Sequence, residues 1–426
     1  MVVWFIIFGL WLFMHRPFEI WAFLAAFRVA RLYMVLLIAA WLYSLLSNPN
    51  SGRSSGNLFT VAICLYTLAA TASALFSPYI DVASNIQYQD WLKYLVFYAM
   101  LVTCVKTERD LKIVLIGLVV SFFLFMAHSY WEFLHGRVIL AAGVPRLVGV
   151  GITFSEFNDY GTMIVCMLPL MFPLFVLCKK PWHYLFILGY TLLALRSVLL
   201  TGSRTAFVML AILTVLPILF SRYRFRLLPF ILLAAVVGWF AMPEHMQDRY
   251  RTIWDSNVSE WANVNREARV MHFYEGMDNW ASSPIFGVGP GAHGHATGLG
   301  LQAHNLYGQV AGETGTLGIM AFLFMLSCFG INHYRIWKHY KYLRENNLDK
   351  EGRFCWQLSL AVMFGVIMIL LQGLGLHNAF RFPWVWFGAL QVLAVMVMQE
   401  KVSAATQRTH ASRMNDPSLP DSNRHA

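Results

Sequence analysis

The chain has 426 residues, of which 58% are hydrophobic and only 13% are charged, and its mean hydropathy is +0.55. A single water-soluble core cannot bury that much apolar surface, so the composition excludes an ordinary soluble protein and predicts an integral membrane protein. The formal net charge of +10 is no sign of nucleic-acid binding here. In a membrane protein the distribution of Lys and Arg among the loops is the informative quantity.

Apolar runs long enough to cross a bilayer as helices recur along the whole chain. They predict an all-α protein of about twelve transmembrane helices, at residues 2–14, 18–46, 57–76, 91–105, 113–134, 159–178, 182–200, 205–220, 227–242, 304–333, 355–375 and 383–399. The topology of residues 1–46 is left open, because "HRPFE" interrupts the first run and one kinked helix or a re-entrant piece would also fit. The first helix is expected to be an anchor and not a removable signal peptide.

Basic residues cluster at every second gap between these runs, and the positive-inside rule predicts that those gaps and both termini are cytoplasmic. The basic groups are Arg53; Lys106, Arg109 and Lys112; Lys179 and Lys180; Arg222, Arg224 and Arg226; and the run from Tyr334 to Arg353. The alternate gaps are therefore predicted to face the other side of the membrane. The largest of them, residues 243–303, contains no lysine.

This pattern divides the chain into four regions. We expect transmembrane helices over 1–242, an exported loop with an amphipathic helix over 243–303, transmembrane helices over 304–400 and a disordered cytoplasmic tail over 401–426. The six cysteines lie in or at the edges of the predicted spans, without zinc-ligand spacing. Neither a disulfide framework nor a cysteine-based metal site is therefore expected.

The exported loop is the one segment long enough to fold outside the membrane. Apolar residues at helical spacing predict an amphipathic helix over Arg266–Trp280 that lies on the membrane surface or caps the bundle. The apolar positions are Val270, Phe273, Met277 and Trp280. Arg266 and Arg269 share a face of this helix. They are either two solvated arginines or a bidentate clamp for a phosphate or diphosphate.

The glycine-rich stretch "GVGPGAHGHATGLG" is not a nucleotide-binding loop, because no GK[ST] follows it and no βαβ pattern precedes it. Its histidines, His293 and His295, could ligate a metal ion together with the nearby His304. No carboxylate lies at tight spacing to complete the set, so loop histidines and no metal site are expected.

Three motifs follow one another in a fixed order: "GSRTA" at Gly202–Ala206, "SPIFGVGPG" at Ser283–Gly291 and "AHNLYGQVAGETGTLGIMAF" at Ala303–Phe322. Their order resembles the bacterial O-antigen ligase and O-antigen polymerase superfamily. In that family an Arg begins a middle helix, a large periplasmic loop follows, and "HN...Q...E.G..G" opens the next helix. The motifs cover roughly residues 150–330, and the hydropathy profile extends the likeness to nearly the whole chain.

The resemblance implies a GT-C-like membrane glycosyltransferase of the bacterial inner membrane, without metal or other cofactor and with its active site facing the periplasm. Such enzymes transfer an undecaprenyl-diphosphate-linked glycan en bloc to an acceptor hydroxyl. A ligase uses the lipid A core as acceptor, and a polymerase of O-antigen or exopolysaccharide uses a glycan. We favour the ligase-like activity, with the polymerase as the alternative and the lipid bilayer as a partner in both.

This reaction requires a base near the acceptor hydroxyl and positive charge near the leaving diphosphate. His304 is the candidate base because histidine titrates near neutrality, although a purely positioning role stays open. The family pattern makes Arg204 and Arg269 the candidate catalytic cations, with Arg266 close behind as a substrate-binding residue.

Five further residues are candidates for substrate binding. They are Asn305, Gln309, Glu313, His377 and Arg381. Asn305 could fix the imidazole or the substrate, and Glu313 is expected to meet an Arg or another polar partner because an unpaired carboxylate in apolar sequence is costly. For Gln309 and Glu313 a structural role in interhelical bonding is an equal alternative. His377 and Arg381, in "LHNAFRF", lie on the same predicted side and could extend the anion site.

Two other classes of protein were weighed against the enzyme. A transporter or lipid flippase would carry charged residues midway along several helices and would show paired repeats. The polar residues here concentrate at one exported rim instead. A non-catalytic scaffold of an envelope polysaccharide complex would leave His304 dispensable.

Overall fold

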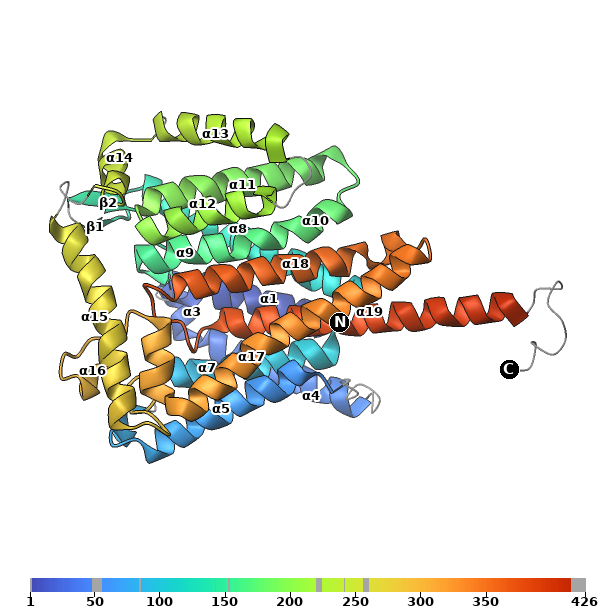
Figure 1. The fold of residues 1–426 in the computed structure, drawn as a ribbon, viewed down its shortest axis with the longest axis horizontal. Helices are drawn as coiled ribbons and strands as arrows, with labels where there is room; N and C mark the ends of the chain where they lie inside the picture. Colours follow the sequence, from blue (N-terminus) through green and yellow to red (C-terminus); the bar gives the residue numbers. More distant parts are fainter. Residues whose placement is uncertain are drawn as a thin grey trace.

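A computed structural model describes residues 2–47, 56–83, 86–141, 143–151, 154–219, 224–240, 242–255 and 260–414. Long apolar helices form the body of the protein (Figure 1). They are α1 (Val2–His15), α4 (Val29–Ser47), α5 (Leu58–Phe76), α7 (Ile86–Cys104), α8 (Glu108–Leu134), α9 (Phe157–Met167), α11 (Pro181–Thr201), α12 (Arg204–Leu219), α13 (Arg224–Phe240), α17 (Leu306–Glu345), α18 (Asp349–Gln372) and α19 (Phe382–Met414).

Shorter elements connect the long helices. They are α2 (Pro17–Ile20), α3 (Ala22–Ala26), α6 (Ile80–Ala83), the antiparallel strands β1 (Ile139–Ala141) and β2 (Val144–Arg146), the 3-10 turn Leu168–Met171, α10 (Phe172–Leu177), α14 (Glu244–Arg251), α15 (Glu260–Ser282) and α16 (His293–Ala296). Two of the apolar runs that predicted a span are divided: run 18–46 among α2, α3 and α4, and run 159–178 among α9, the 3-10 turn and α10. Each of the other runs is occupied by one of the long helices.

Nine helical segments of the described chain are long and apolar enough to cross a membrane. The expected all-α membrane protein is therefore confirmed, whereas the expected number of about twelve spans is larger than this set. The difference is explained by α12 and α13, which have 16 and 17 residues, and by α7, which also carries Asp90 and Lys93. Large apolar side chains also point outward, including Leu46 and Phe240 at 81% and 78% exposure, which suits a surface that faces lipid.

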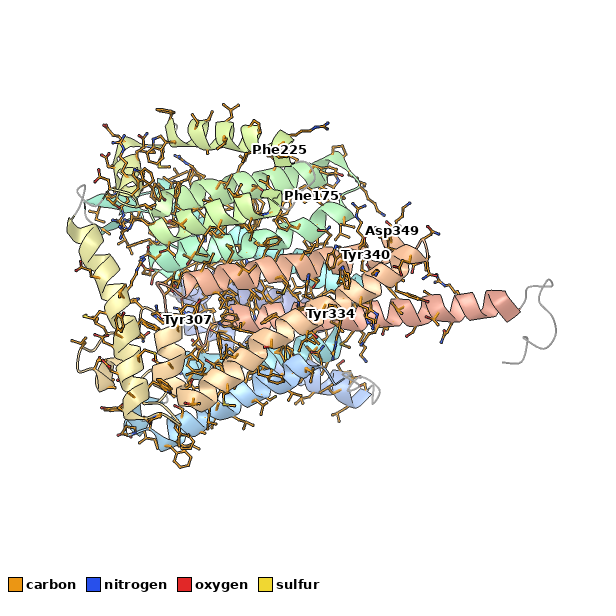
Figure 2. The ribbon with its side chains drawn as sticks, in the orientation of Figure 1. Phe175, Phe225, Tyr307, Tyr334, Tyr340 and Asp349 are labelled. Carbon is orange, nitrogen blue, oxygen red and sulfur yellow. The ribbon has the colours of Figure 1, made fainter. Side chains whose placement is uncertain are left out.

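The two ends of the bundle differ. One end carries β1, β2, α14, α15 and α16, and we call it the loop end (Figure 1). Figure 2 shows Tyr307 at the loop end of α17, while Tyr340 and Asp349 lie at the opposite end. The segments predicted to be exported thus share the loop end, and the basic run that begins at Tyr334 lies at the other end.

The expectation of a disordered tail after residue 400 is wrong for residues 401–414, because α19 continues to Met414. Side chains of other helices hold this extension. Lys401 forms a 2.6 Å ion pair with Glu108, and the Thr406 hydroxyl lies 3.2 Å from that of Tyr342. Residues 415–426 lie outside the described part of the chain.

The helix α17 changes direction at Gly315, which has φ of 63° and ψ of −165°. The break leaves backbone groups without helical partners, and the segment around Pro284–Gly289 supplies them. Val288 N–H donates to Gly312 O at 2.8 Å and Thr316 N–H donates to Pro284 O at 2.8 Å. The "SPIFGVGPG" motif therefore provides hydrogen-bond partners for backbone groups that the break in α17 leaves without helical ones.

The helix α15 runs across the loop end and packs against the first turns of α17 (Figure 1). It contains the predicted helix 266–280, but a different face is buried. His272, Gly276 and Asn279 face the bundle, whereas Val270 is 53% exposed. Small and polar residues allow the closest approach to α17, while Phe273, Met277 and Trp280 of the predicted apolar stripe are half-buried.

Candidate functional site

A cavity of about 500 Å³ opens at the loop end. Helices and loops far apart in the sequence contribute to its wall, which is lined by Arg16, Asp90, Tyr94, Ser155, Glu156, Asn158, Asp159, Ala268, Arg269, His272, His304, Gly375, Leu376, His377, Phe380 and Arg381. Four of the residues expected at the site are therefore present in one wall: Arg269, His304, His377 and Arg381.

His304 lies two residues before the first turn of α17 and not within the helix. Asn305 is the N-cap residue, and its Oδ1 accepts hydrogen bonds from the N–H groups of Tyr307 and Gly308 at 2.9 and 3.0 Å. This cap fixes the chain just after His304. The His304 ring lies between those of His272 and His377, with centroid distances of 5.4 and 5.6 Å.

The environment of His304 favours the neutral imidazole. Burial, reinforced by the neighbouring His272 and Arg269, lowers the pKa of His304 below its usual value. A neutral imidazole has a free lone pair and can accept a proton at neutral pH. His304 thus has the protonation state and the position of a general base in the cavity wall.

Arg269 reaches the cavity from α15. Its Nη1 donates to the Thr205 hydroxyl at 3.1 Å, so it touches the first turn of α12 directly beside Arg204. It also lies against the backbone of Gly375, where an added Cβ would be 3.1 Å from Nη1. A side chain at residue 375 would therefore require the guanidinium to shift by a few tenths of an ångström.

Arg204 does not line the cavity. It begins α12, and its Nη1 donates to the carbonyl and hydroxyl oxygens of Thr252 at 3.4 and 3.3 Å. The turn before it depends on Gly202, which ends α11 with φ of 58° in the left-handed region. This is the physical reason for glycine in "GSRTA".

Two arginines that the sequence did not single out as catalytic or substrate-binding lie close to Arg204 and Arg269. Arg146 is 2% exposed, stacks over the Phe157 ring at 4.3 Å, and has no hydrogen-bond partner for its Nε among the described residues. Arg249 donates from Nε to Gly202 O at 3.4 Å. Burial, with the positive charges of Arg146 and Arg269, lowers the pKa of Arg249 to about 10.

These side chains form an arginine cluster, which we define as Arg146, Arg204, Arg249 and Arg269. Each is close enough to another member for their charges to interact, and Glu156 is the carboxylate that opposes Arg146 and Arg269. Several partly buried guanidiniums facing one carboxylate attract a multiply charged anion. Arg146 ends β2 and Arg249 lies on the short helix α14, so the tertiary fold brings the two together with Arg204 and Arg269.

Arg381 and His377 have different surroundings. Arg381 Nη2 forms a 2.8 Å ion pair with Asp159 Oδ2, so its charge is already opposed within the cavity wall. His377 lies beside His304, and burial lowers its pKa well below the usual value. Glu156, a further carboxylate of this wall, accepts the Asp159 N–H at 2.8 Å and caps α9.

None of Asn305, Gln309 and Glu313 lines the cavity. Gln309 Nε2 donates to Glu313 at 3.2 Å, and its Oε1 accepts the Ala379 N–H at 3.1 Å. Glu313 also accepts the backbone N–H groups of Gly291 and His293. The expected polar partner of Glu313 is thus an amide and the backbone of the exported loop.

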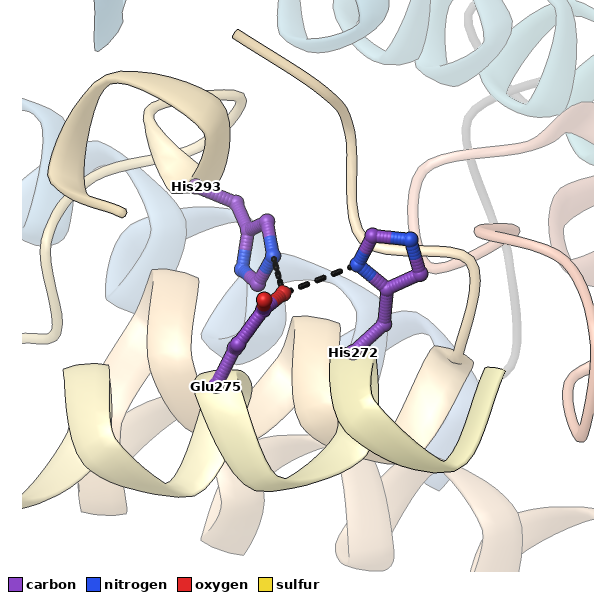
Figure 3. Close-up of side chains that lie close together, drawn as sticks. All are labelled: His272, Glu275 and His293. Carbon is purple, nitrogen blue, oxygen red and sulfur yellow. Dashed lines mark hydrogen bonds and ion pairs between the residues drawn. The ribbon is translucent and has the colours of Figure 1, made fainter. Parts of the chain in front are cut away.

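Two remaining expectations concern Arg266 and the loop histidines. The backbone of Arg266 belongs to α15, while its side chain lies outside the described part of the structure. His293 is buried, with Glu275 and His272 beside it (Figure 3), whereas His295 is exposed. No carboxylate lies at tight sequence spacing to these histidines, but Glu275, which is distant in sequence from His293, is adjacent to it in space.

The fold and the cavity define a multi-pass membrane protein with a basic, histidine-lined site at one end of its helices. Residues 189–323 match the family model described as O-Antigen ligase. The resemblance to the O-antigen ligase superfamily is thereby confirmed over these residues. The match, about a third of the chain, includes Arg204, Arg249, Arg269 and His304. None of the curated proteins compared with the chain matches it.

Proposed function

We propose that the protein transfers an undecaprenyl-diphosphate-linked glycan to an acceptor hydroxyl in the cavity at the loop end, on the periplasmic side of the inner membrane. The observation that carries this proposal is the juxtaposition of His304, a half-buried imidazole with a lowered pKa, with Arg269, which joins the cavity to the arginine cluster. A base and a cationic site for the leaving group are the two elements that the reaction needs.

The chemical step follows from these positions. The acceptor oxygen attacks the anomeric carbon while His304 takes the hydroxyl proton, and the bond from that carbon to the diphosphate oxygen breaks. The diphosphate leaves with the electron pair and with additional negative charge. Arg269 meets this charge in the cavity, while Arg204, Arg146 and Arg249 raise the positive potential behind it. The scheme needs no metal ion at the reacting atoms.

His377, Arg381 and Arg266 are proposed to help bind the substrate. His377 and Arg381 line the same cavity as His304. Because Asp159 pairs with Arg381, that arginine is better suited to hydrogen-bond the glycan than to hold the diphosphate. Asn305, Gln309 and Glu313 support the site by fixing the backbone on both sides of His304 and at the start of α17.

The test uses purified protein in nanodiscs with an undecaprenyl-diphosphate glycan and a panel of acceptors. His304→Ala, Arg204→Ala and Arg269→Ala are compared with wild type after each variant is shown to fold. His295→Ala is the matched control, since His295 is an exposed histidine of the same loop. We expect transfer to be lost in the first three variants and retained in the control.

The products also separate two activities with the same donor. A single added block corresponds to the ligase-like reaction that we favour, and a ladder of repeats corresponds to a polymerase. Undiminished transfer by His304→Ala and both arginine variants would refute the assignment of the site. Absence of transfer by wild type with every acceptor would refute the proposed activity, and a flippase assay would follow.

A further inference from the structure

Three metal-ligating side chains converge beside the cavity, between α15 and α16 (Figure 3). His272 Nδ1 and His293 Nε2 lie 2.8 and 3.4 Å from the same Glu275 oxygen. One ligand atom from each residue fits within 4.8 Å of the other two. His272, Glu275 and His293 have side-chain exposures of 5%, 15% and 1%, so the group is a buried cluster and not a chance surface encounter.

The backbone holds these residues in place independently of any ligand. His272 and Glu275 are three residues apart in α15 and therefore share one face of the helix. His293 begins α16, where its own N–H donates to Glu313. The following Gly294 is so close to Leu301 that an added Cβ would lie 2.5 Å from the Leu301 carbonyl oxygen. The loop that carries His293 is thus tightly folded, and the cluster is preorganised.

The distances suit a tetrahedral ion. With metal–nitrogen bonds of about 2.0–2.1 Å, neighbouring ligands of a tetrahedral ion are about 3.4 Å apart. The separation of His293 and Glu275 already has this value, at 3.4 Å, and that of His272 and Glu275 needs to open from 2.8 Å. Shifts of a few tenths of an ångström and the loss of the imidazole protons would admit the ion.

The chemistry of the set is also that of a metal site. Two imidazoles and one carboxylate are the three protein ligands of zinc sites in which water or substrate occupies the fourth position. Ligating histidines usually make a second hydrogen bond through the other ring nitrogen. Nδ1 of His293 lies 3.2 Å from Asn279 Nδ2, and a flip of that amide would place its Oδ1 there to accept the Nδ1–H of the ligating imidazole. Burial lowers the pKa of His293, which favours the neutral, ligating form.

We propose that His272, Glu275 and His293 bind a first-row divalent transition metal ion, with zinc as the best match. The ion joins α16 to α15 and thereby fastens the exported loop to the helix that carries Arg269. His272 also lines the cavity beside His304, whereas Glu275 and His293 do not. The ion therefore lies behind the cavity wall, where it positions His272 and does not contact the reacting atoms. This site stands independently of the proposed glycosyl transfer.

The test measures metal binding by the purified full-length protein after removal of any histidine tag and treatment with a chelator. Titration with Co²⁺ is followed by visible absorption, and Zn²⁺ is then used to displace it. We expect one equivalent per chain with a tetrahedral cobalt spectrum. Glu275→Gln and His293→Gln are expected to weaken binding by at least about tenfold. His295→Gln and Glu267→Gln, which change exposed residues of the same segments, should bind as wild type does.

A second measurement protects the test against variants that fail to fold. X-ray absorption of the zinc-loaded wild-type protein should show nitrogen and oxygen neighbours with two imidazoles and no sulfur. Thermal unfolding of wild type and both controls should shift upward with Zn²⁺, and the shift should vanish in His293→Gln. The proposal is overturned if wild type binds no stoichiometric ion, if sulfur ligates the zinc, or if all variants bind equally.

Discussion

Gly276 lies where α15 crosses the start of α17, and the crossing has no room for a side chain. A Cβ added at Gly276 would lie 2.5 Å from both Cα and O of Gly308, whereas carbon atoms in ordinary contact are about 3.5–4.0 Å apart. Because the neighbouring atoms belong to backbone, no side-chain rotation can relieve the overlap. Gly276→Ala is therefore expected to push α15 away from α17 by about 1 Å.

This displacement should affect rate far more than stability. Overpacking of a tight contact costs about 1–3 kcal/mol, but replacing Gly by Ala in a helix returns up to about 1 kcal/mol. The free energy of unfolding should thus fall by no more than about 2 kcal/mol. A misplacement of about 1 Å at reacting groups costs about 100-fold in rate. Since α15 carries Arg269 and His272, Gly276→Ala should fold and transfer glycan about 100-fold more slowly.

The assay compares transfer rates in nanodiscs with thermal unfolding for wild type, Gly276→Ala and Gly330→Ala. Gly330 belongs to α17, the helix that Gly276 of α15 contacts, but a Cβ added at Gly330 meets nothing within 4 Å. Gly330→Ala should therefore keep the wild-type rate and be at least as stable. A wild-type rate in Gly276→Ala, or equal slowing in both variants, would refute the argument that this crossing sets the geometry of the site.

Three further predictions use the same preparations. Arg249→Ala should slow transfer by about 10²- to 10³-fold because it removes a cation from the arginine cluster. Arg251→Ala, which loses only an exposed pair with Asp248, should leave the transfer rate unchanged. Equal rates in the two variants would contradict the cluster's role. The wild-type rate should fall as the pH drops through the lowered pKa of His304, at a pH below the ordinary histidine value of about 6.5. His304→Gln should be about 10²- to 10⁴-fold slower, and its rate should not show this fall at acid pH. The same fall at acid pH in the variant would assign the titration to another group. Glu313→Ala should lower the free energy of unfolding by about 1–3 kcal/mol, because it leaves buried donors of Gln309, Gly291 and His293 unpaired; an unaltered unfolding temperature would show that these contacts do not stabilise the loop.

Much of the fold could be predicted because apolar composition and segment length act locally. Each apolar run forms helix, and the basic gap before α18 lies at the end opposite to the loop end. The prediction failed where long-range packing decides the outcome. Residues 401–414 are polar enough to suggest disorder, yet contacts with Glu108 and Tyr342 keep them helical.

The candidate site was predicted only in part, because long-range packing also decides which residues meet there. His304 and Arg269 share the cavity wall, and the resemblance to the O-antigen ligase superfamily pointed to both. Arg146, Arg249 and Glu275 acquire their relation to the site only through the tertiary fold, because the chain brings them together from separate elements. Hydrophobic periodicity predicted the helix of α15, but not that Gly276 would form its closest approach to α17.

The spacing of "HNLYGQVAGETG" is better explained by packing than by chemistry. Within it His304 alone lines the cavity. Gly308 and Gly312, four residues apart, let α15 approach closely, with a Cβ at Gly312 only 2.7 Å from Gly276 O. Gly315 takes a left-handed φ, and an added Cβ would lie 2.4 Å from Ile285 O. The glycines therefore form the cradle in which the exported loop docks, and that docking aligns Arg269 and His272 with His304. The motif therefore determines how the loop packs against α17 as well as the position of His304. Substitutions at its glycines should impair transfer even though these residues do not contact the substrate.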